Sequence, residues 1–207
     1  MLIERPPYLY RWFFPKARWR FNMHEKVVYL TFDDGPIPKI TPWVLDILDN
    51  YNIKATFFCV ADNVRKYPEI YRQILERGHL TGNHTYHHLQ GLKTFSKQYL
   101  KDVEEASKLI SGNLFRPPHG HLRFPQFFRL RKKYEIIMWD VVTRDYSCLT
   151  TKEQVLENVK KYTRNGSIIV FHDSLKAEEK MKYALPKAIE WLLKNGYRFE
   201  LIEKENK

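Results

Sequence analysis

Cysteine is scarce in this chain of 207 residues, which contains only Cys59 and Cys148. Two cysteines without a characteristic spacing do not make a disulfide scaffold, and they suit a reducing compartment. Long apolar runs are absent too: the apolar runs of this chain are all much shorter than a membrane-spanning helix. Near the N-terminus, Arg11 and Pro15 interrupt the apolar residues that a signal peptide would need. We therefore expect the protein in the cytoplasm or on the inner surface of the membrane.

Internal repeats, low-complexity tracts and linkers rich in glycine and serine are also absent, so we expect one main domain over residues 27–207. It follows a lead-in segment, residues 1–26, which mixes aromatic side chains with Arg and Lys. We favour the interpretation that these aromatic side chains pack on the main domain. The alternative is a peripheral membrane contact through residues 8–21, because aromatic and basic side chains together suit a membrane interface.

Basic residues outnumber acidic ones, and the formal net charge is +11. Such an excess attracts acidic partners, for example an anionic glycan, a phospholipid surface or nucleic acid. No block of Lys and Arg dominates the chain and no nucleic-acid-binding motif is found. We therefore favour a basic, soluble surface and expect no nucleic-acid partner. The composition leaves the oligomeric state open.

Short apolar runs alternate with helix-like segments along the main domain. Strands are expected at residues 27–32, 54–60, 79–83, 113–118, 135–142, 167–173 and 197–203. Helices are expected at residues 41–51, 68–78, 96–110, 125–134, 151–166 and 182–196. About seven alternating repeats of this kind predict an α/β fold whose parallel sheet is covered on both faces. The sheet is either open and doubly wound or closed into a barrel.

Unusual polar residues follow the expected strands at one end. They are Asp33 and Asp34 after the first strand, His84 and His88 after the third, Arg116 at the end of the fourth, Asp140 and Asp145 at the end of the fifth, and His172 at the end of the sixth. The C-terminal ends of parallel strands form the edge where α/β proteins build their sites. We therefore expect these side chains to surround one active site.

His84 and His88 are four residues apart, so their imidazoles share one face if the chain becomes helical after Asn83. A carboxylate from Asp33 or Asp34 would complete a set of three ligands, which is typical of open, catalytic metal sites. A divalent metal held in this way activates water and polarises a carbonyl group. Successive side chains of an extended strand point in different directions, so the second aspartate could act as a general base. A solvated, histidine-rich turn is the alternative.

Three further residues suit the hydrolysis of an acyl group. His172 could protonate the leaving group, and Asp145 could orient and charge His172. Arg116 could hold the carboxylate base in place. His172 and Arg116 also have plainer interpretations, as a satisfied histidine at a strand end and as one half of a surface ion pair.

Five motifs contain these residues: TFDDGP at 31–36, HTYHH at 84–88, RPPHG at 116–120, WDVVTRDY at 139–146 and IIVFHD at 168–173. Together they resemble the motifs of the polysaccharide deacetylases of the NodB-homology type, carbohydrate esterase family 4. The resemblance spans roughly residues 27 to 202 and implies a distorted (β/α) barrel of about seven repeats. It also implies a metal-dependent hydrolase that removes N-acetyl groups from the N-acetylated sugars of a glycan or glycoconjugate.

The resemblance assigns roles to individual residues. The metal ligands that it implies are Asp34, His84 and His88. The catalytic residues that it implies are Asp33 as base, Arg116 beside the base, the backbone N–H of His119 at the oxyanion, and Asp145 paired with the general acid His172. Zinc is the default metal, while cobalt, nickel, iron and manganese are compatible with the same ligands.

Four positions depart from the family's pattern. His119 stands where the third motif usually has tyrosine, and Val142 stands where an aspartate is common in the fourth. Tyr146 and Phe171 stand where tryptophan and leucine are usual. We expect Tyr146 and Phe171, together with Pro118, to contact the substrate, and the two replacements to affect the size of the acyl pocket.

Two other functions stay open at this point. One is an O-acetyl esterase acting on glycans, whose alkoxide leaving group would depend less on His172. The other is a sugar-binding or membrane-associated relative with impaired catalysis, against which the complete set of metal ligands and acid–base residues argues. The expected substrate is an acetylated carbohydrate, and the expected location favours a small or lipid-linked glycan.

Overall fold

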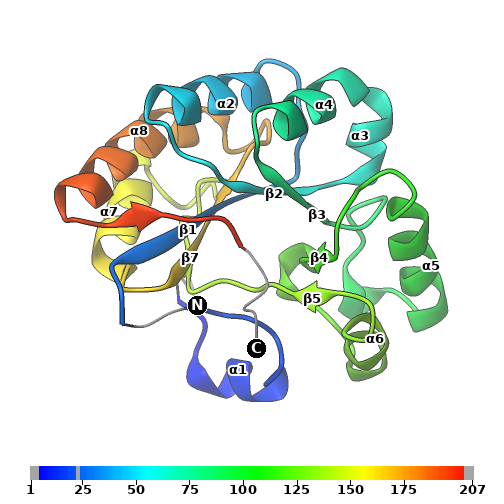
Figure 1. The fold of residues 1–207 in the computed structure, drawn as a ribbon. Coiled ribbons are helices and arrows are strands. Elements are labelled where there is room, and N and C mark those ends of the chain that lie inside the picture. Colours follow the sequence, from blue (N-terminus) through cyan, green and yellow to red (C-terminus); the bar gives the residue numbers. More distant parts are fainter. Residues whose placement is uncertain (1–4, 22–23, 203–207) are drawn as a thin grey trace.

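The computed structural model describes residues 5–21 and 24–202 (Figure 1). The strands are β1 (Val27–Asp33), β2 (Thr56–Cys59), β3 (Leu80–Asn83), β4 (Leu114–Phe115), β5 (Glu135–Ile136), β6 (Val141–Val142), β7 (Ser167–His172) and β8 (Arg198–Phe199). The α-helices are α1 (Tyr8–Phe13), α2 (Ile40–Asn50), α3 (Ala61–Lys66), α4 (Pro68–Glu76), α5 (Ser96–Ala106), α6 (Phe124–Leu130), α7 (Lys152–Tyr162) and α8 (Glu178–Lys194). Two short 3-10 helices are η1 (Gly91–Lys93) and η2 (Pro118–Gly120).

The strands form one curled sheet in the order β5-β4-β3-β2-β1-β7-β6, and β8 pairs with β1. All of these pairs are parallel. Helices α7, α8, α2, α4, α3, α5 and α6 follow one another around the outside of the sheet (Figure 1). The predicted α/β fold, a distorted (β/α) barrel, is confirmed.

The central strands β1 and β7 separate the core into an outer and an inner layer, because successive side chains of a strand point to opposite faces. Leu30 and Phe32 of β1 join Ile169 and Phe171 of β7 in the core cluster beneath the helices. The alternate residues of β1 point into the barrel, and the last of these is Asp33. This alternation decides which side chains at the strand ends can reach a central site.

The expected fifth strand is split in two. Residues 135–142 were expected as one strand, but β5 pairs with β4 while β6 pairs with β7, so the segment crosses between the two edges of the sheet. The lead-in segment supplies hydrogen bonds to the crossing. The N–H of Arg18 donates to the Ile136 carbonyl, and the N–H of Met138 donates to the Arg18 carbonyl, each at 2.8 Å.

The lead-in segment has a packed half and an exposed half. Phe14, Trp19 and Phe21 are buried against the domain. Asp140 is also buried, and it anchors the segment by accepting from Arg11 at 2.6 Å. The side chain of Trp12, in contrast, is 73% exposed.

Helix α8 begins four residues earlier than expected, and Pro186 lies inside it instead of near its start. Two acidic residues in its first turn, Glu178 and Glu179, favour this earlier start through the helix dipole.

In the described part of the chain, no helix combines the length and hydropathy needed to cross a membrane.

Candidate active site

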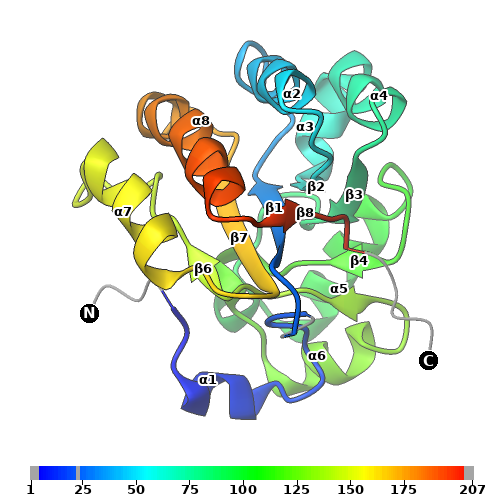
Figure 2. The same cartoon turned by 60° about the vertical axis from the view of Figure 1, so that its left-hand side comes forward.

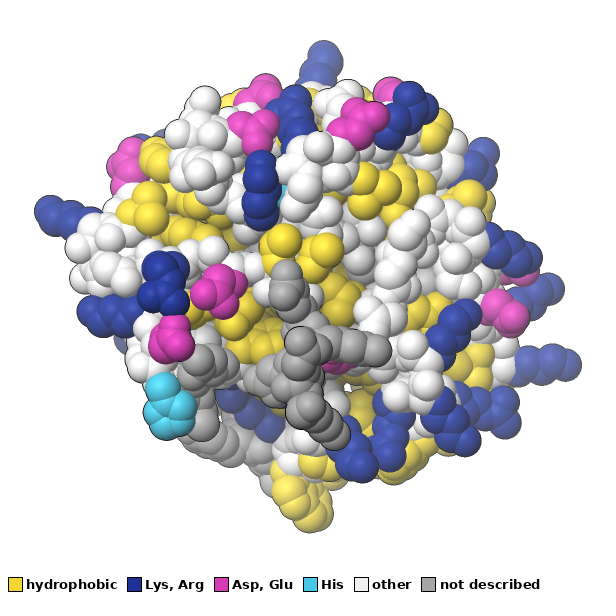
Figure 3. Space-filling view, in the orientation of Figure 1, with side chains coloured by type: hydrophobic (Ala, Val, Ile, Leu, Met, Phe, Trp, Pro, Cys, Tyr) yellow, Lys and Arg dark blue, Asp and Glu magenta, His cyan; other side chains and the backbone are white. Residues whose placement is uncertain are grey.

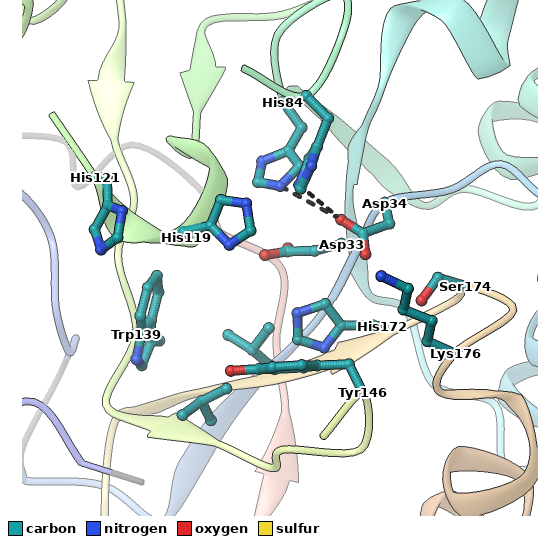
Figure 4. Close-up of a pocket in the computed structure, with 13 residues that line it drawn as sticks. Asp33, Asp34, His84, His119, His121, Trp139, Tyr146, His172, Ser174 and Lys176 are labelled. Carbon is teal, nitrogen blue, oxygen red and sulfur yellow. Dashed lines mark ion pairs between the residues drawn. The ribbon is translucent and has the colours of Figure 1, made fainter. Parts of the chain in front are cut away.

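Several of the predicted site residues meet at the C-terminal edge of the sheet. Asp33 ends β1 and is paired in register with His172, which ends the neighbouring β7. His84 follows β3 directly. These residues border a cavity of about 380 Å³, whose walls carry five of the eight histidines of the chain (Figure 4). So many imidazoles around one cavity suit metal binding and proton transfer near neutral pH.

Asp33 is the more deeply buried aspartate of the pair. Its Oδ1 accepts a hydrogen bond from Arg116 Nη1 at 2.6 Å. Arg116 is fully buried and also donates to Thr31 Oγ1 and to the Met138 carbonyl. The plainer interpretation of Arg116, a surface ion pair, is therefore wrong. A guanidinium fixed from several sides fixes in turn the orientation of the Asp33 carboxylate, which lines the cavity.

Asp34 points away from Asp33 because the backbone changes conformation between them. The φ angle of Asp34 is 83°, in the left-handed region, so a turn and not an extended strand separates the two carboxylates. Asn63 Nδ2 holds this turn by donating to the Asp34 carbonyl at 2.8 Å. The Asp34 carboxylate consequently faces His84 and His88 (Figure 4).

Asp34, His84 and His88 offer three ligand atoms that all lie within 4.8 Å of one another. Asp34 Oδ1 is 3.1 Å from His88 Nε2 and 3.7 Å from His84 Nε2. Burial lowers the pKa of His84 to about 4, which keeps this imidazole neutral. Its Nδ1 donates to the Arg116 carbonyl at 2.7 Å, so the lone pair of Nε2 is directed at the other two residues. The three residues therefore fit a divalent metal ion.

The loop that carries both histidines is not helical, which corrects our expectation. Thr85 and His88 have φ angles of 67° and 55°, so left-handed residues bring the imidazoles together. Asp102 of α5 pins the loop by accepting from the N–H groups of Tyr86 and His87 at 2.7 and 3.1 Å. His87 Nδ1 also pairs with Asp102, so this ring points away from the ligands.

His172 is held by Asp145 through two hydrogen bonds. The backbone N–H of His172 donates to Asp145 Oδ2, and Nδ1 lies 2.8 Å from Asp145 Oδ1. Burial lowers the pKa of His172, but the carboxylate of Asp145, helped by those of Asp34 and Asp33, outweighs burial and raises it to about 9. The ring of Tyr146 packs edge-on against the imidazole with 4.6 Å between ring centres. His172 is therefore protonated at neutral pH, with Nε2 left for the cavity.

A family model described as polysaccharide deacetylase matches residues 21–135, which is more than half of the chain. The chain belongs to the polysaccharide deacetylase family. It is a hydrolase that cleaves the carbon–nitrogen bond of N-acetyl groups on glycans, and the Asp34–His84–His88 cluster is consistent with the metal site of that family.

Similar proteins include the peptidoglycan-N-acetylglucosamine deacetylase of Bacillus cereus, which is 32% identical over 192 residues covering 89% of this chain and 90% of that protein. The peptidoglycan-N-acetylmuramic acid deacetylase PdaA of Bacillus subtilis is 31% identical over 195 residues, covering 88% and 72%. The crystal structure of the Bc1960 peptidoglycan N-acetylglucosamine deacetylase, in complex with 4-naphthalen-1-yl-N-oxidanyl-benzamide, has a TM-score of 0.84 at 30% identity and covers 95% of each chain.

In this polysaccharide deacetylase, the third motif brings His119 to the cavity wall. The residue is left-handed, with a φ angle of 59°, and its ring centre lies 5.0 Å from that of His88. Its backbone N–H has no acceptor among the described residues. Gly120 follows with a φ angle of 70°, and a Cβ there would approach Trp139 to 2.5 Å. The geometry leaves the His119 N–H free for a substrate oxygen.

The three residues expected at the substrate do not all reach the cavity. Tyr146 lines it, but Phe171 and Pro118 do not. Phe171 is 1% exposed and packs against Phe32 in the outer core layer. Its neighbour Val170 lines the cavity instead, because adjacent strand residues point to opposite faces.

One residue of the polysaccharide deacetylase site was missed by the sequence analysis. Asp173 is fully buried beside the first motif, where it accepts from the Gly35 N–H at 3.1 Å and from Thr41 Oγ1 at 2.5 Å. A Cβ at Gly35 would lie only 1.9 Å from Asp173 Oδ2. Asp173 therefore clamps the turn that carries Asp34, and Gly35 must remain a glycine. Its position directly after His172 was the available signal.

Proposed function

We propose that this polysaccharide deacetylase removes the acetyl group from N-acetylglucosamine units of a peptidoglycan-type glycan and that its metal is zinc. The observation that carries the proposal is one cavity bordered by a three-ligand cluster, a fixed carboxylate and a protonated histidine. The choice of sugar is supported by the similar Bacillus cereus protein and by the similar crystal structure, each described as a peptidoglycan N-acetylglucosamine deacetylase.

Asp34, His84 and His88 would hold the zinc ion. Two imidazoles and one carboxylate suit zinc and leave room for further ligands. When bound, such an ion activates water and polarises the acetyl carbonyl. The hydrogen bond from His84 to the Arg116 carbonyl keeps the first imidazole oriented for this purpose.

Asp33 takes the proton from the attacking water. Its carboxylate borders the cavity, and the buried Arg116 prevents it from rotating away. As the acetyl carbon becomes tetrahedral, negative charge develops on its oxygen. The unpaired N–H of His119 donates to that oxygen.

His172 gives a proton to the departing amine. An amine leaves poorly without protonation, and the charge on Asp145 keeps the imidazole in its acidic form until the carbon–nitrogen bond breaks. Tyr146 packs against the ring and limits its rotation. The products are acetate and a glucosamine unit.

Lys176 favours a second candidate substrate, N-acetylmuramic acid, which carries a carboxylate that glucosamine lacks. Lys176 is exposed at the rim of the cavity, and no hydrogen-bond or ion-pair partner is found for it in the described part of the chain (Figure 4). An acidic substituent of the substrate would supply that partner. Lys176→Met should then lower kcat/KM for muramic acid substrates and leave neutral oligosaccharides unaffected.

Acetate release tests the proposal. Zinc-loaded protein is incubated with N-acetylglucosamine oligosaccharides and, in parallel, with peptidoglycan fragments. Mass spectrometry of the fragments then shows whether the glucosamine or the muramic acid units have lost acetyl groups. We expect deacetylated glucosamine units, and no acetate from the Asp33→Asn control. Absence of acetate from every N-acetylated glycan, in protein that retains zinc, would refute the proposal.

A further inference from the structure

Large apolar side chains project from one end of the molecule, where α1, η1 and α6 lie. The side chains of Trp12, Phe95 and Phe128 are 73%, 77% and 51% exposed. At the lower edge of Figure 3, apolar side chains project beside a group of Lys and Arg. We call this region the aromatic–basic surface and define its apolar part as Trp12, Phe13, Leu92, Phe95, Phe124 and Phe128.

The aromatic–basic surface is continuous across its three elements. The rings of Phe13 in α1 and Phe124 in α6 are 6.2 Å apart, and Phe128 lies one turn beyond Phe124 on the same helix. Arg123, which precedes α6, donates to the Leu92 carbonyl at 2.8 Å and lies over the ring of Phe95 at 5.8 Å. Residues distant in sequence thus form one surface.

The three segments that build this surface carry basic residues and no acidic ones. Residues 5–21 contain five Lys and Arg, residues 88–101 contain three Lys, residues 113–134 contain six Lys and Arg, and none of these segments contains Asp or Glu. Lys16, Arg129 and Lys132 are exposed, and none has an ion-pair partner among the residues that the structure describes. These three cations therefore leave uncompensated positive charge beside the aromatic side chains.

We propose that the aromatic–basic surface docks on a bilayer that contains anionic phospholipid. Aromatic rings settle at the level of the lipid headgroups, while Lys and Arg are attracted to the negative surface. Charge complementarity selects this partner over a second copy of the chain. A symmetric dimer through the same surface would bring the uncompensated cations of both copies together.

Docking in this orientation would bring the cavity close to the bilayer. Arg123 belongs to the aromatic–basic surface. It follows His119 and His121, which line the cavity, in the same stretch of chain. Tyr10 of α1 donates to the Gly120 carbonyl at 2.8 Å, so the surface and the cavity wall are joined. If the proposed function holds, the enzyme acts on glycan at the membrane. Vesicle binding itself does not depend on turnover.

Vesicle sedimentation tests the docking. Zinc-loaded protein is mixed with vesicles of phosphatidylcholine alone or with phosphatidylglycerol added, at low and at high salt. We expect binding to the anionic vesicles that weakens with salt, and little binding to phosphatidylcholine. The double variant Trp12→Ser with Phe128→Ser should lower the partition coefficient between water and anionic vesicles about tenfold or more. Arg129→Gln and Lys132→Gln should each lower it about fivefold.

The matched control is Leu75→Ser on α4, whose side chain is 40% exposed and which lies at the opposite end of the molecule from α1 (Figures 1 and 2). It should bind vesicles like the unchanged protein. Circular dichroism checks the fold of every variant. Equal binding by the double variant and the unchanged protein would overturn the proposal. Absence of binding to anionic vesicles at low salt would overturn it too. Binding of soluble glycan by the aromatic–basic surface, without binding of vesicles, would have the same consequence.

Discussion

The pairing of Asp145 with His172 predicts a specific effect of the change Asp145→Asn. Burial lowers the pKa of His172, and the charge of Asp145 raises it to about 9. This is roughly 2.5 units above the ordinary histidine value, or about 3 kcal/mol of preference for the protonated form. Without that charge, only the smaller effects of the Asp34 and Asp33 carboxylates oppose burial, and the pKa of His172 should fall towards its ordinary value.

The loss of the proton should be visible in the rate. At pH 8, a histidine with a pKa of 9 is about 90% protonated, whereas one with a pKa of 6.5 or less is about 3% protonated or less. If His172 is the general acid, kcat for an N-acetylated oligosaccharide should fall by up to about thirtyfold at pH 8. The alkaline limb of the kcat profile, measured between pH 5 and 10, should shift from about pH 9 towards pH 6.5.

Asp140→Asn is the matched control for this experiment. Asp140 and Asp145 are equally buried, but Asp140 is held by Arg11 and Arg164, away from the cavity. Its replacement should lower stability and leave the alkaline limb in place. An unchanged alkaline limb in folded, zinc-loaded Asp145→Asn would show that Asp145 does not set the protonation of His172.

The same pair also links stability to pH in the metal-free protein. Because the folded pKa of His172 lies above the unfolded one, the folded state binds more protons between pH 6.5 and 9. The stabilisation is therefore complete below pH 6.5 and is lost as the pH rises through 9. Urea unfolding at pH 6 and at pH 10 should show this loss, about 3 kcal/mol at most, and the loss should be smaller in Asp145→Asn.

Asp33→Asn should retain zinc by elemental analysis and lose at least a hundredfold in kcat, whereas Asp34→Ala should lose zinc and activity together; the reverse pattern would exchange their roles. His172→Ala should reduce the hydrolysis of N-acetyl amides far more than that of O-acetyl esters, because an alkoxide needs less protonation, and equal losses would contradict this role. Gly35→Ala should destabilise the protein by about 2 kcal/mol in urea unfolding, since its Cβ would overlap Asp173, and unchanged stability would contradict the clamp.

The polar residues at the strand ends could be predicted because the parallel sheet brings all C-terminal ends to one edge. The positions of Asp33 and His172 depend only on that rule and on the strand register. Phe171 could have been excluded by the same logic. Adjacent residues of a strand face opposite sides, so Phe171 and His172 cannot both reach the cavity.

The convergence of His84 and His88 could not be predicted in detail. It depends on left-handed residues in the loop and on hydrogen bonds that the loop donates to Asp102, which lies on a different element. Such bonds follow from the packing of α5 against the loop, which no local pattern encodes. For the same reason, the sequence did not reveal that residues 135–142 would divide into β5, which pairs with β4, and β6, which pairs with β7.

The hydrogen bonds that Arg18 makes across the split between β5 and β6 have a consequence for the order of folding. Residues 5–21 are synthesised early, but Arg18 and Arg20 pair with Ile137 and Ser167, more than a hundred residues later in the sequence. Contacts so distant in sequence form late, because a long loop must close first. During synthesis, the aromatic and basic side chains of this segment therefore lack their partners until the later residues have been made. Until those partners are made, the segment is open to chaperones and to misassociation.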